Sequence, residues 1–173
     1  MPGPIFIRGD GVDLHPVDEE DLPFLQEVIN DPSIWLTLGR ARPATLKDEE
    51  DFYEHAVQAD NQEHLIIATD GEAVGIIGLH DINHIWGTAE LGYFLSSDHH
   101  GKGYVTEAVG LLSDWAFGHL RIEKLIASVL DGNPASQRVL EKNGYTEEGR
   151  LTEFAFVDGE RLDLLIYGRQ ADQ

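Results

Sequence analysis

The residues with the clearest chemical use lie around two glycines, Gly101 and Gly103, directly ahead of an amphipathic segment. A helix that begins there exposes unpaired main-chain N–H groups, and its dipole favours negative charge at that end. Glycines let an anion such as a diphosphate approach the main chain closely. The stretch matches neither the phosphate loop of nucleotide hydrolases nor the GxGxxG fingerprint of dinucleotide-binding domains. Such a glycine pair also occurs in ordinary loops, so the neighbouring residues must decide.

The elements that position this loop can be predicted from hydrophobic periodicity. Spacing of i, i+3, i+4 and i+7 predicts a helix after Gly103, and Asp18, Thr45 and Asn133 are expected to begin three more. Apolar runs and alternation predict strands, the last two joined by a two-residue turn, at residues 12–17, 65–69, 73–79, 89–95, 125–130, 153–157 and 161–167. This order of elements predicts an α/β (α+β) domain with a mixed sheet.

The composition favours one globular domain over residues 1–173. A hydrophobic content of 42% is enough for a core, and the chain has no cysteine for a disulfide or a thiolate metal site. No apolar run approaches the length of a membrane span, and the first residues lack the pattern of a secretory signal. We therefore expect a cytoplasmic protein without a membrane partner. The sequence is compatible with a homodimer as well as with a monomer.

The charge balance bears on partners and on salt. With 12 basic and 32 acidic residues the formal net charge is −20, and this field opposes direct binding of nucleic acid. The acidic residues are dispersed and form no tail-like block. Because self-repulsion of this size is tolerated when salt screens it, as in halophilic proteins, we expect the protein to work at high ionic strength.

Several blocks of residues resemble the GNAT superfamily of N-acetyltransferases. AELGY at 89–93, followed by HGKGYVTEA at 100–108, is similar to the acyl-CoA motif of that family, and NPASQRVLEKNGY at 133–145 resembles the next block. Residues 14–22 and the closing hairpin, with Asp163 and Tyr167, extend the match over nearly the whole chain. Together these blocks look like the branch that includes ribosomal-protein N-terminal acetyltransferases of the RimJ/RimL type.

The resemblance implies a mixed, mostly antiparallel sheet that is splayed between its fourth and fifth strands, with helices on both faces. These strands would be residues 88–95 and 124–130, and acetyl-CoA would lie between them as a co-substrate, without a metal. The pantetheine arm would pair with the fourth strand near Phe94 and Leu95. The diphosphate would rest on main-chain amides of the loop, those of His99, His100, Gly101, Lys102, Gly103 and Tyr104. Asp98 stands where the family has Gln or Arg, so it is expected to point away or to cap the helix.

Acetylation of an amine requires a neutral nucleophile, whereas α-amino and lysine groups have pKa values of about 8 and 10.4. A general base is therefore useful. Glu90 is the best candidate, because a carboxylate in an otherwise apolar strand favours a water-filled cleft. Alternatively, Glu90 faces solvent or holds a structural salt bridge. Glu153 and His84 are weaker candidates. A main-chain N–H at or near Leu95 is expected to stabilise the oxyanion.

The helix that begins at Asn133 supplies the remaining candidates. The resemblance implies that Asn133 contacts the pantetheine amide, although it can also be a plain helix cap. It places Ser136 near the sulfur, where its hydroxyl would donate to the leaving group; a solvated serine is the alternative. Many relatives have a tyrosine acid where this chain has Leu140, so that route is closed. Tyr145 is expected to be a packed aromatic residue.

The sequence leads to an acetyl-CoA-dependent N-acetyltransferase that acts on a primary amine, either a small molecule or a protein N-terminus. Trp35, Arg40 and Arg42 lie where the family carries its acceptor-side loop, and the arginines are either carboxylate receptors or solvated cations. A non-catalytic acyl-CoA-binding module is the alternative function. A metal hydrolase built on His80 and His84, which are four residues apart, is a third reading; their setting favours a loop without metal.

Overall fold

The computed structural model describes residues 2–172, which form a single eight-stranded sheet flanked by helices. The spatial order of the strands is β1-β2-β3-β4-β5-β6-β8-β7, and every neighbouring pair is antiparallel except β5 and β6. The strands are β1 (Ile7–Arg8), β2 (Asp13–Pro16), β3 (Glu63–Thr69), β4 (Glu72–Asn83), β5 (Thr88–Leu95), β6 (Lys124–Leu130), β7 (Thr146–Val157) and β8 (Glu160–Gln170). The predicted mixed, mostly antiparallel sheet is confirmed.

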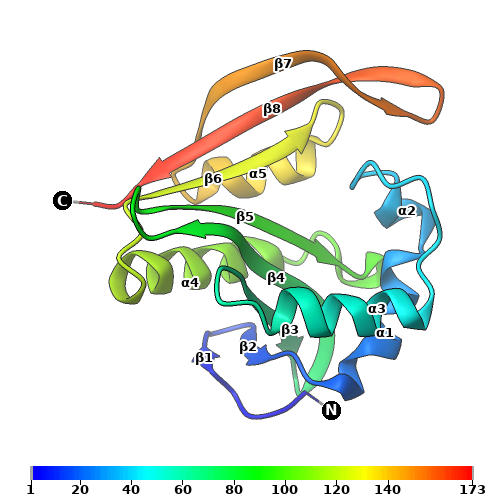
Figure 1. The fold of residues 1–173 in the computed structure, drawn as a ribbon, viewed down its shortest axis with the longest axis vertical. Helices are drawn as coiled ribbons and strands as arrows, with labels where there is room; N and C mark the ends of the chain where they lie inside the picture. The colour runs from blue at the N-terminus through cyan, green and yellow to red at the C-terminus, as the bar shows by residue number, and fades with distance from the viewer. Residues whose placement is uncertain (1, 173) are drawn as a thin grey trace.

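Helices cover both faces of the sheet, as Figure 1 shows. They are α1 (Leu22–Ile29), α2 (Pro32–Trp35), α3 (Leu46–Phe52), α4 (Tyr104–His119) and α5 (Pro134–Lys142), with shorter turns η1 (Glu19–Asp21), η2 (Tyr53–Val57) and η3 (Ser97–His99). Strand alternation divides the core between the faces. Ile66 of β3 packs with Leu25 of α1, whereas its neighbour Ile67 belongs to the cluster that contains Leu112 of α4. In the described chain no helix is long and apolar enough to cross a membrane.

Strands β5 and β6 separate after a short paired stretch. They pair only from Thr88 to Glu90 on β5 and from Lys124 to Ile126 on β6. β6 then remains paired with β8 to its end, so it is held away from the second half of β5. Figure 1 shows the two strands diverging toward the side of the molecule that carries α2. The expected splay is thus confirmed, although these strands are the fifth and sixth of the sheet, because the short β1 was not predicted.

Other differences from the sequence-based expectations have local causes. β7 is much longer than the predicted strand at 153–157, and most of its residues are exposed on the sheet edge. It therefore lacks the alternation that reveals a half-buried strand. The helix that Thr45 caps ends at Phe52 and continues as a π-helical turn. Asp18 caps the short turn η1 rather than α1 itself.

Candidate active site

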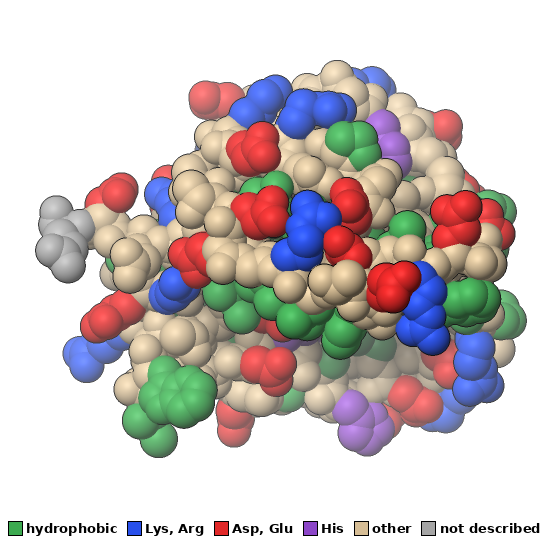
Figure 2. Space-filling view, turned by 90° about the horizontal axis from the view of Figure 1, so that it is seen from above, with side chains coloured by type: hydrophobic (Ala, Val, Ile, Leu, Met, Phe, Trp, Pro, Cys, Tyr) green, Lys and Arg blue, Asp and Glu red, His purple; other side chains and the backbone are tan. Residues whose placement is uncertain are grey.

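A cleft of about 760 Å³ opens where β5 and β6 diverge. Its walls come from the segment after α1, from β5, from the loop before α4, from β6 and the start of α5, and from the β7–β8 hairpin. Apolar side chains line the hollow on the face seen in Figure 2, where acidic and basic side chains are interspersed over the rim. The predicted cofactor residues in the walls are Phe94, Leu95, His99, His100, Gly101, Gly103, Tyr104, Asn133 and Ser136.

The main chain of β5 offers free hydrogen-bonding groups to this cleft. Ser96 N–H donates to the Val74 carbonyl across the β4–β5 pair. Because successive residues of a strand direct their main-chain groups to opposite sides, those of Tyr93 and Leu95 point toward the open edge. His100 confirms this direction, since its Nε2 lies 2.9 Å from the Leu95 carbonyl oxygen. The edge at which a pantetheine arm was expected is therefore open, and the Leu95 N–H faces it.

The loop that follows β5 presents donors at one end of the cleft. Gly101 and Gly103 have φ values of +75° and +82°, a left-handed conformation that glycine adopts without strain. The first N–H groups of any α-helix have no acceptor within the helix. In α4 the cap residue is Gly103, which has no side chain to accept a hydrogen bond from them. The loop therefore lets a ligand approach its main chain closely and presents several N–H groups to it. An anion-binding site requires both features.

Two of the predicted main-chain donors are already used. His99 N–H donates to the Ser96 carbonyl and His100 N–H donates to the Ser97 carbonyl, because η3 closes a tight turn there. In this geometry neither N–H group is free for a diphosphate, and the role of the two residues in cofactor binding stays a prediction. The donors that remain begin at Gly101 and continue into the first turn of α4. Lys102 is exposed outside the cleft walls, with its Nζ 6.0 Å from the centre of the Tyr104 ring.

Asp98 does not cap the helix, since Gly103 occupies the cap position. The carboxylate lies within η3, is exposed to solvent, and is not part of the cleft wall. Of the two predicted roles, the structure agrees with the one in which Asp98 points away. The cleft therefore avoids a negative charge beside an anion.

The first turn of α5 forms the opposite wall. Asn133 Oδ1 accepts a hydrogen bond from Ser136 N–H at 3.3 Å, so Asn133 caps the helix while lining the cleft. The Ser136 hydroxyl lies 2.6 Å from the hydroxyl of Tyr93. Burial raises the pKa of Tyr93 to about 12. Sequence reasoning missed Tyr93, because its contact is with a residue 43 positions away.

Glu90 lies at the vertex where β5 and β6 part. It is half-buried, and its Oε1 accepts a hydrogen bond of 3.1 Å from the hydroxyl of Ser128 on β6. Among the described side chains it has no ion-pair partner, so the alternative of a structural salt bridge is not supported. Glu90 occupies the face of β5 that carries Gly92 and Phe94, whereas Tyr93 points to the other face.

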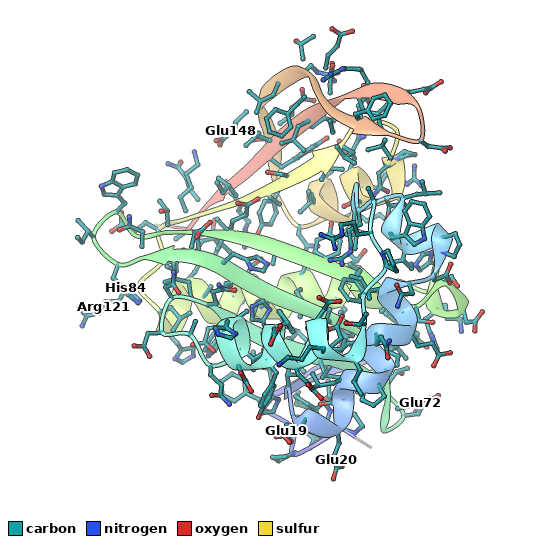
Figure 3. All side chains as sticks on the ribbon, turned by 45° about the vertical axis from the view of Figure 1, so that its right-hand side comes forward. Glu19, Glu20, Glu72, His84, Arg121 and Glu148 are labelled. Atoms are coloured by element: carbon teal, nitrogen blue, oxygen red, sulfur yellow. The ribbon has the colours of Figure 1, made fainter. Side chains whose placement is uncertain are left out.

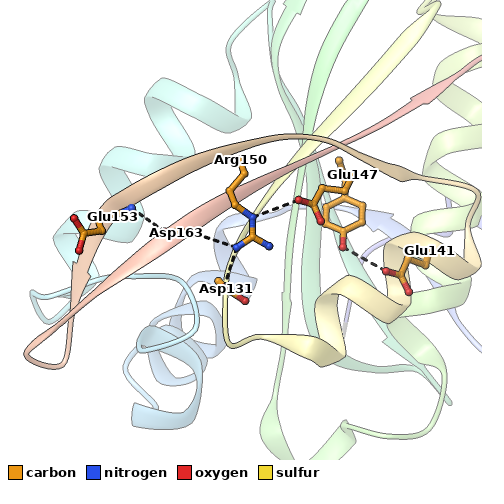
Figure 4. A network of polar contacts seen from close by, with 7 residues as sticks. Asp131, Glu141, Glu147, Arg150, Glu153 and Asp163 are labelled. Atoms are coloured by element: carbon orange, nitrogen blue, oxygen red, sulfur yellow. Dashed lines mark hydrogen bonds and ion pairs between the residues drawn. The ribbon is translucent and has the colours of Figure 1, made fainter.

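Like Glu90, the weaker candidates lie outside the cleft wall. His84 is exposed in the turn between β4 and β5, at the end of the sheet opposite α2 (Figure 3). Glu153 is exposed on β7, where its N–H donates to Asp163. Asp163 in turn accepts from Arg150, which also contacts Asp131 and Glu147 (Figure 4). Glu153 therefore belongs to a structural network of the hairpin.

The interpretations of Leu140 and Tyr145 are confirmed. Leu140 is completely buried in the core. Tyr145 is 1% exposed, and its hydroxyl lies 2.8 Å from that of Ser113. Burial raises the pKa of Tyr145. Neither residue reaches the cleft.

The segment after α1 lines the cleft, and its arginines agree with the alternative of solvated cations. Thr37, Leu38 and Gly39 line it, whereas Arg40 and Arg42 are exposed outside the wall. His80 lies on β4 rather than in a loop. In the described chain, the one group of three potential metal ligands within 4.8 Å of one another is Asp51, Glu54 and His55, all exposed and outside this site.

A second cavity of about 210 Å³ lies beside the cleft on the α3 face of the sheet. Phe52, His64, Ile76 and His80 line it, and it shares Leu38, Gly92, Tyr93 and Phe94 with the cleft. Burial lowers the pKa of His64 to about 4, with a smaller contribution from His80. The imidazole of His64 is therefore neutral near pH 7.

Comparisons with known proteins agree with this geometry. Residues 12–146 match the family model described as "Acetyltransferase (GNAT) domain". The chain is 28% identical over 149 residues to spermidine N(1)-acetyltransferase of Escherichia coli strain K12, covering 86% of this chain and 80% of that protein. It is 26% identical over 170 residues to ribosomal-protein-serine acetyltransferase of the same strain, covering 94% of each.

Solved structures show the same fold. Spermidine N-acetyltransferase from Vibrio cholerae, in complex with CoA and spermine, has a TM-score of 0.88 and 22% identity, covering 94% of this chain and 96% of that one. The ribosomal alpha-N-protein acetyltransferase RimL, in complex with coenzyme A, has a TM-score of 0.85 and 20% identity, covering 98% and 99%.

Proposed function

The chain belongs to the GNAT acetyltransferase family, and on this premise we propose that it acetylates a primary amine by direct attack within a ternary complex. It is an acetyl-CoA-dependent N-acetyltransferase; the acceptor and the residue roles are the proposal. The observation that carries it is the open edge of β5, which leads from the vertex at Glu90 to the donors at Gly101 and Gly103.

The chain's own groups fit acetyl-CoA as a substrate. Main-chain groups of Tyr93 pair with the pantetheine amides as a missing strand would, which leaves the Leu95 N–H free. The first amides of α4, together with those of Gly101 and Gly103, hold the diphosphate. Asn133 lies opposite β5 and contacts the arm through the side chain that also caps α5.

Leu95 N–H and the Ser136 hydroxyl stabilise the charges that develop during transfer. The thioester carbonyl gains negative charge when the amine attacks, and the Leu95 N–H at the open edge donates to it. The Ser136 hydroxyl then donates a hydrogen bond to the departing sulfur. A thiolate has a pKa of about 8.5, so it leaves without full protonation.

The proton lost by the amine is taken up on the face of β5 that carries Glu90. This carboxylate is half-buried and accepts a hydrogen bond from Ser128, which lines the cleft. Glu90 itself is the last residue of β5 that pairs with β6, just outside the cleft wall. A general base on this face acts on the amine directly or through one water. Because the chain contains no cysteine, no thiol acyl-enzyme can precede the transfer.

The acceptor is an amine of either kind found among the relatives, a small molecule or a protein N-terminus. The test is a screen with acetyl-CoA against spermidine, benzylamine, a hexapeptide with a free N-terminal serine, and the same peptide blocked at its N-terminus but carrying a lysine. Release of free thiol is measured at low and molar KCl. We expect turnover with at least one amine, and intersecting double-reciprocal plots when both substrates are varied.

Two results would contradict different parts of the proposal. Parallel double-reciprocal plots would indicate an acyl-enzyme and contradict direct attack. Binding of coenzyme A by calorimetry without turnover of any amine would contradict the proposed acceptor class.

A further inference from the structure

The cavity beside the cleft is built around two glycines that face each other on neighbouring strands. Gly78 of β4 pairs with Gly92 of β5, and neither has a side chain to fill the α3 face. Two imidazoles occupy this space instead. A Cβ atom on Gly78 would lie 2.5 Å from Nδ1 of His64, and one on Gly92 would lie 3.0 Å from Nε2 of His80. The glycines therefore allow both rings to lie close against the strands.

Gln62 fixes the proton positions on both rings. Its Oε1 lies 2.9 Å from Nε2 of His64 and 3.3 Å from Nδ1 of His80. With the Gln62 amide in this orientation its oxygen accepts from both rings, and each of these ring nitrogens then carries the hydrogen. The two rings also contact each other edge to face, with centroids 5.0 Å apart. In its neutral form His80 is therefore the Nδ1–H tautomer, with a lone pair on Nε2.

The lone pair on Nε2 of His80 lies at the boundary between the smaller cavity and the main cleft. Nε2 of His80 is directed over Gly92, and Gly92 lines both spaces. Among the described side chains it has no hydrogen-bond partner. Glu90 is the residue directly opposite His80 on β5, on the same face of the sheet. An amine that approaches the β5 edge from the α3 side passes this nitrogen.

We propose that His80 is a catalytic residue that accepts the proton of the acceptor amine on Nε2. This inference rests on the proposed amine acetylation. The amine nitrogen forms a bond to the thioester carbon, and its proton passes to Nε2. The C–S bond breaks with its electron pair on sulfur, and the imidazolium later releases its proton to solvent. Gln62 holds the ring through its hydrogen bond to Nδ1.

The cavity also defines the class of acceptor. Besides two glycines, the residues that line it are apolar, aromatic or histidine, and none is a carboxylate: Leu38, Phe52, His64, Ile76, Ile77, His80, Tyr93 and Phe94. A second ammonium group would be desolvated there without a partner, which is costly. The cavity therefore takes an amine carried on an uncharged, apolar group, such as an N-terminal residue with an uncharged side chain, in preference to a polyamine.

The test uses benzylamine and spermidine as probes with acetyl-CoA, and compares wild type with His80→Gln. His84→Gln is the matched control, because that histidine is exposed at the far end of β4. We expect higher kcat/KM for benzylamine than for spermidine in the wild type. General-base catalysis contributes about 10²–10⁴-fold, so His80→Gln should lower kcat with benzylamine by about 100-fold or more. The Kd for coenzyme A should change less than about twofold, and His84→Gln should behave as wild type.

Each outcome has a separate meaning. Undiminished turnover in His80→Gln overturns the role of His80 while leaving acetyl transfer intact. Faster turnover of spermidine overturns the assignment of the cavity. Coenzyme A binding without turnover of any amine by wild type contradicts the proposed function, and with it this inference. Should the variant fail to fold, long-range 1H–15N NMR of the wild type decides, since a proton on Nε2 of neutral His80 would overturn the proposal.

Discussion

The hydroxyl of Tyr93 on β5 lies 2.6 Å from the hydroxyl of Ser136 on α5, and this contact joins the two walls of the cleft. Burial raises the pKa of Tyr93 to about 12, so the phenol stays protonated at any working pH. When it donates to Ser136, the hydrogen of Ser136 is free to point at the sulfur. Full proton transfer from such a phenol to a thiolate of pKa about 8.5 is uphill by several kcal/mol. The pair therefore acts by hydrogen bonding.

Tyr93→Phe should lower kcat by up to about tenfold, because it removes the hydrogen bond that orients the Ser136 hydroxyl, worth about 0.5–1.5 kcal/mol, while Ser136 itself remains. In Ser136→Ala the additional effect of Tyr93→Phe should disappear. The pH titration of thiolate absorbance in bound coenzyme A should show a higher thiol pKa in Tyr93→Phe than in wild type. Tyr167→Phe is the matched control, since that hydroxyl contacts Glu141 on α5 away from the cleft. Additive losses in the double variant would contradict the pairing.

Gly103→Ala should weaken coenzyme A binding. Its φ of +82° costs an alanine about 1–2 kcal/mol, which is relieved by distorting the loop that presents the amides. We expect the Kd from calorimetry to rise about tenfold. Gly118→Ala provides the control, because that glycine lies within α4 and an added Cβ meets no atom within 4 Å. An equal loss of affinity in both variants would contradict the assignment of the loop.

Glu90→Gln should slow acetyl transfer by about tenfold while leaving the Kd for coenzyme A within about twofold, because the carboxylate lies on the face where the amine loses its proton and not beside the nucleotide. Steady-state kinetics with the best amine of the screen and calorimetry with coenzyme A give the two readouts. Glu72→Gln, at the exposed start of β4, is the control. Loss of coenzyme A affinity in Glu90→Gln would point to a structural role at the vertex.

The fold should lose stability in acid through His64. Its pKa falls from an ordinary value near 6.5 to about 4 in the folded chain, chiefly through burial, so the unfolded chain binds the proton more tightly. The stabilisation is complete above pH 6.5 and is lost as the pH falls toward 4, by about 3 kcal/mol. Urea unfolding at several pH values should show a shallower acid dependence for His64→Gln than for wild type. The exposed-site variant His55→Gln should retain the wild-type slope.

Thermal stability should increase between about 0.05 M and 2 M KCl, because screening weakens the mutual repulsion of a chain with net charge −20. Scanning calorimetry at fixed pH measures this change, and coenzyme A binding should strengthen over the lower part of the same range. A melting temperature that falls steadily with salt would contradict the expectation of a protein adapted to high ionic strength.

The sequence by itself determined the features whose causes are local. The bounds of β5 and β6 follow from their apolar runs and turns. The loop before α4 follows from Gly101 and Gly103, whose left-handed conformations need no distant partner. Asn133 could likewise be recognised as a cap, because the bond to Ser136 N–H spans three residues. Periodicity and turn chemistry operate over a few residues, and a single chain displays them directly.

Only the tertiary structure decided which side chains meet. Tyr93 contacts Ser136 and Gln62 holds His80 through pairs far apart in the chain, and no local pattern announces such contacts. The N–H groups of His99 and His100 likewise form hydrogen bonds within the turn η3, which the sequence did not indicate. The exposure of Arg40 and Arg42 outside the cleft is also a result of the tertiary structure. These outcomes depend on how strands register and where β6 is pulled from β5 by β8, and both are set by packing across the whole sheet.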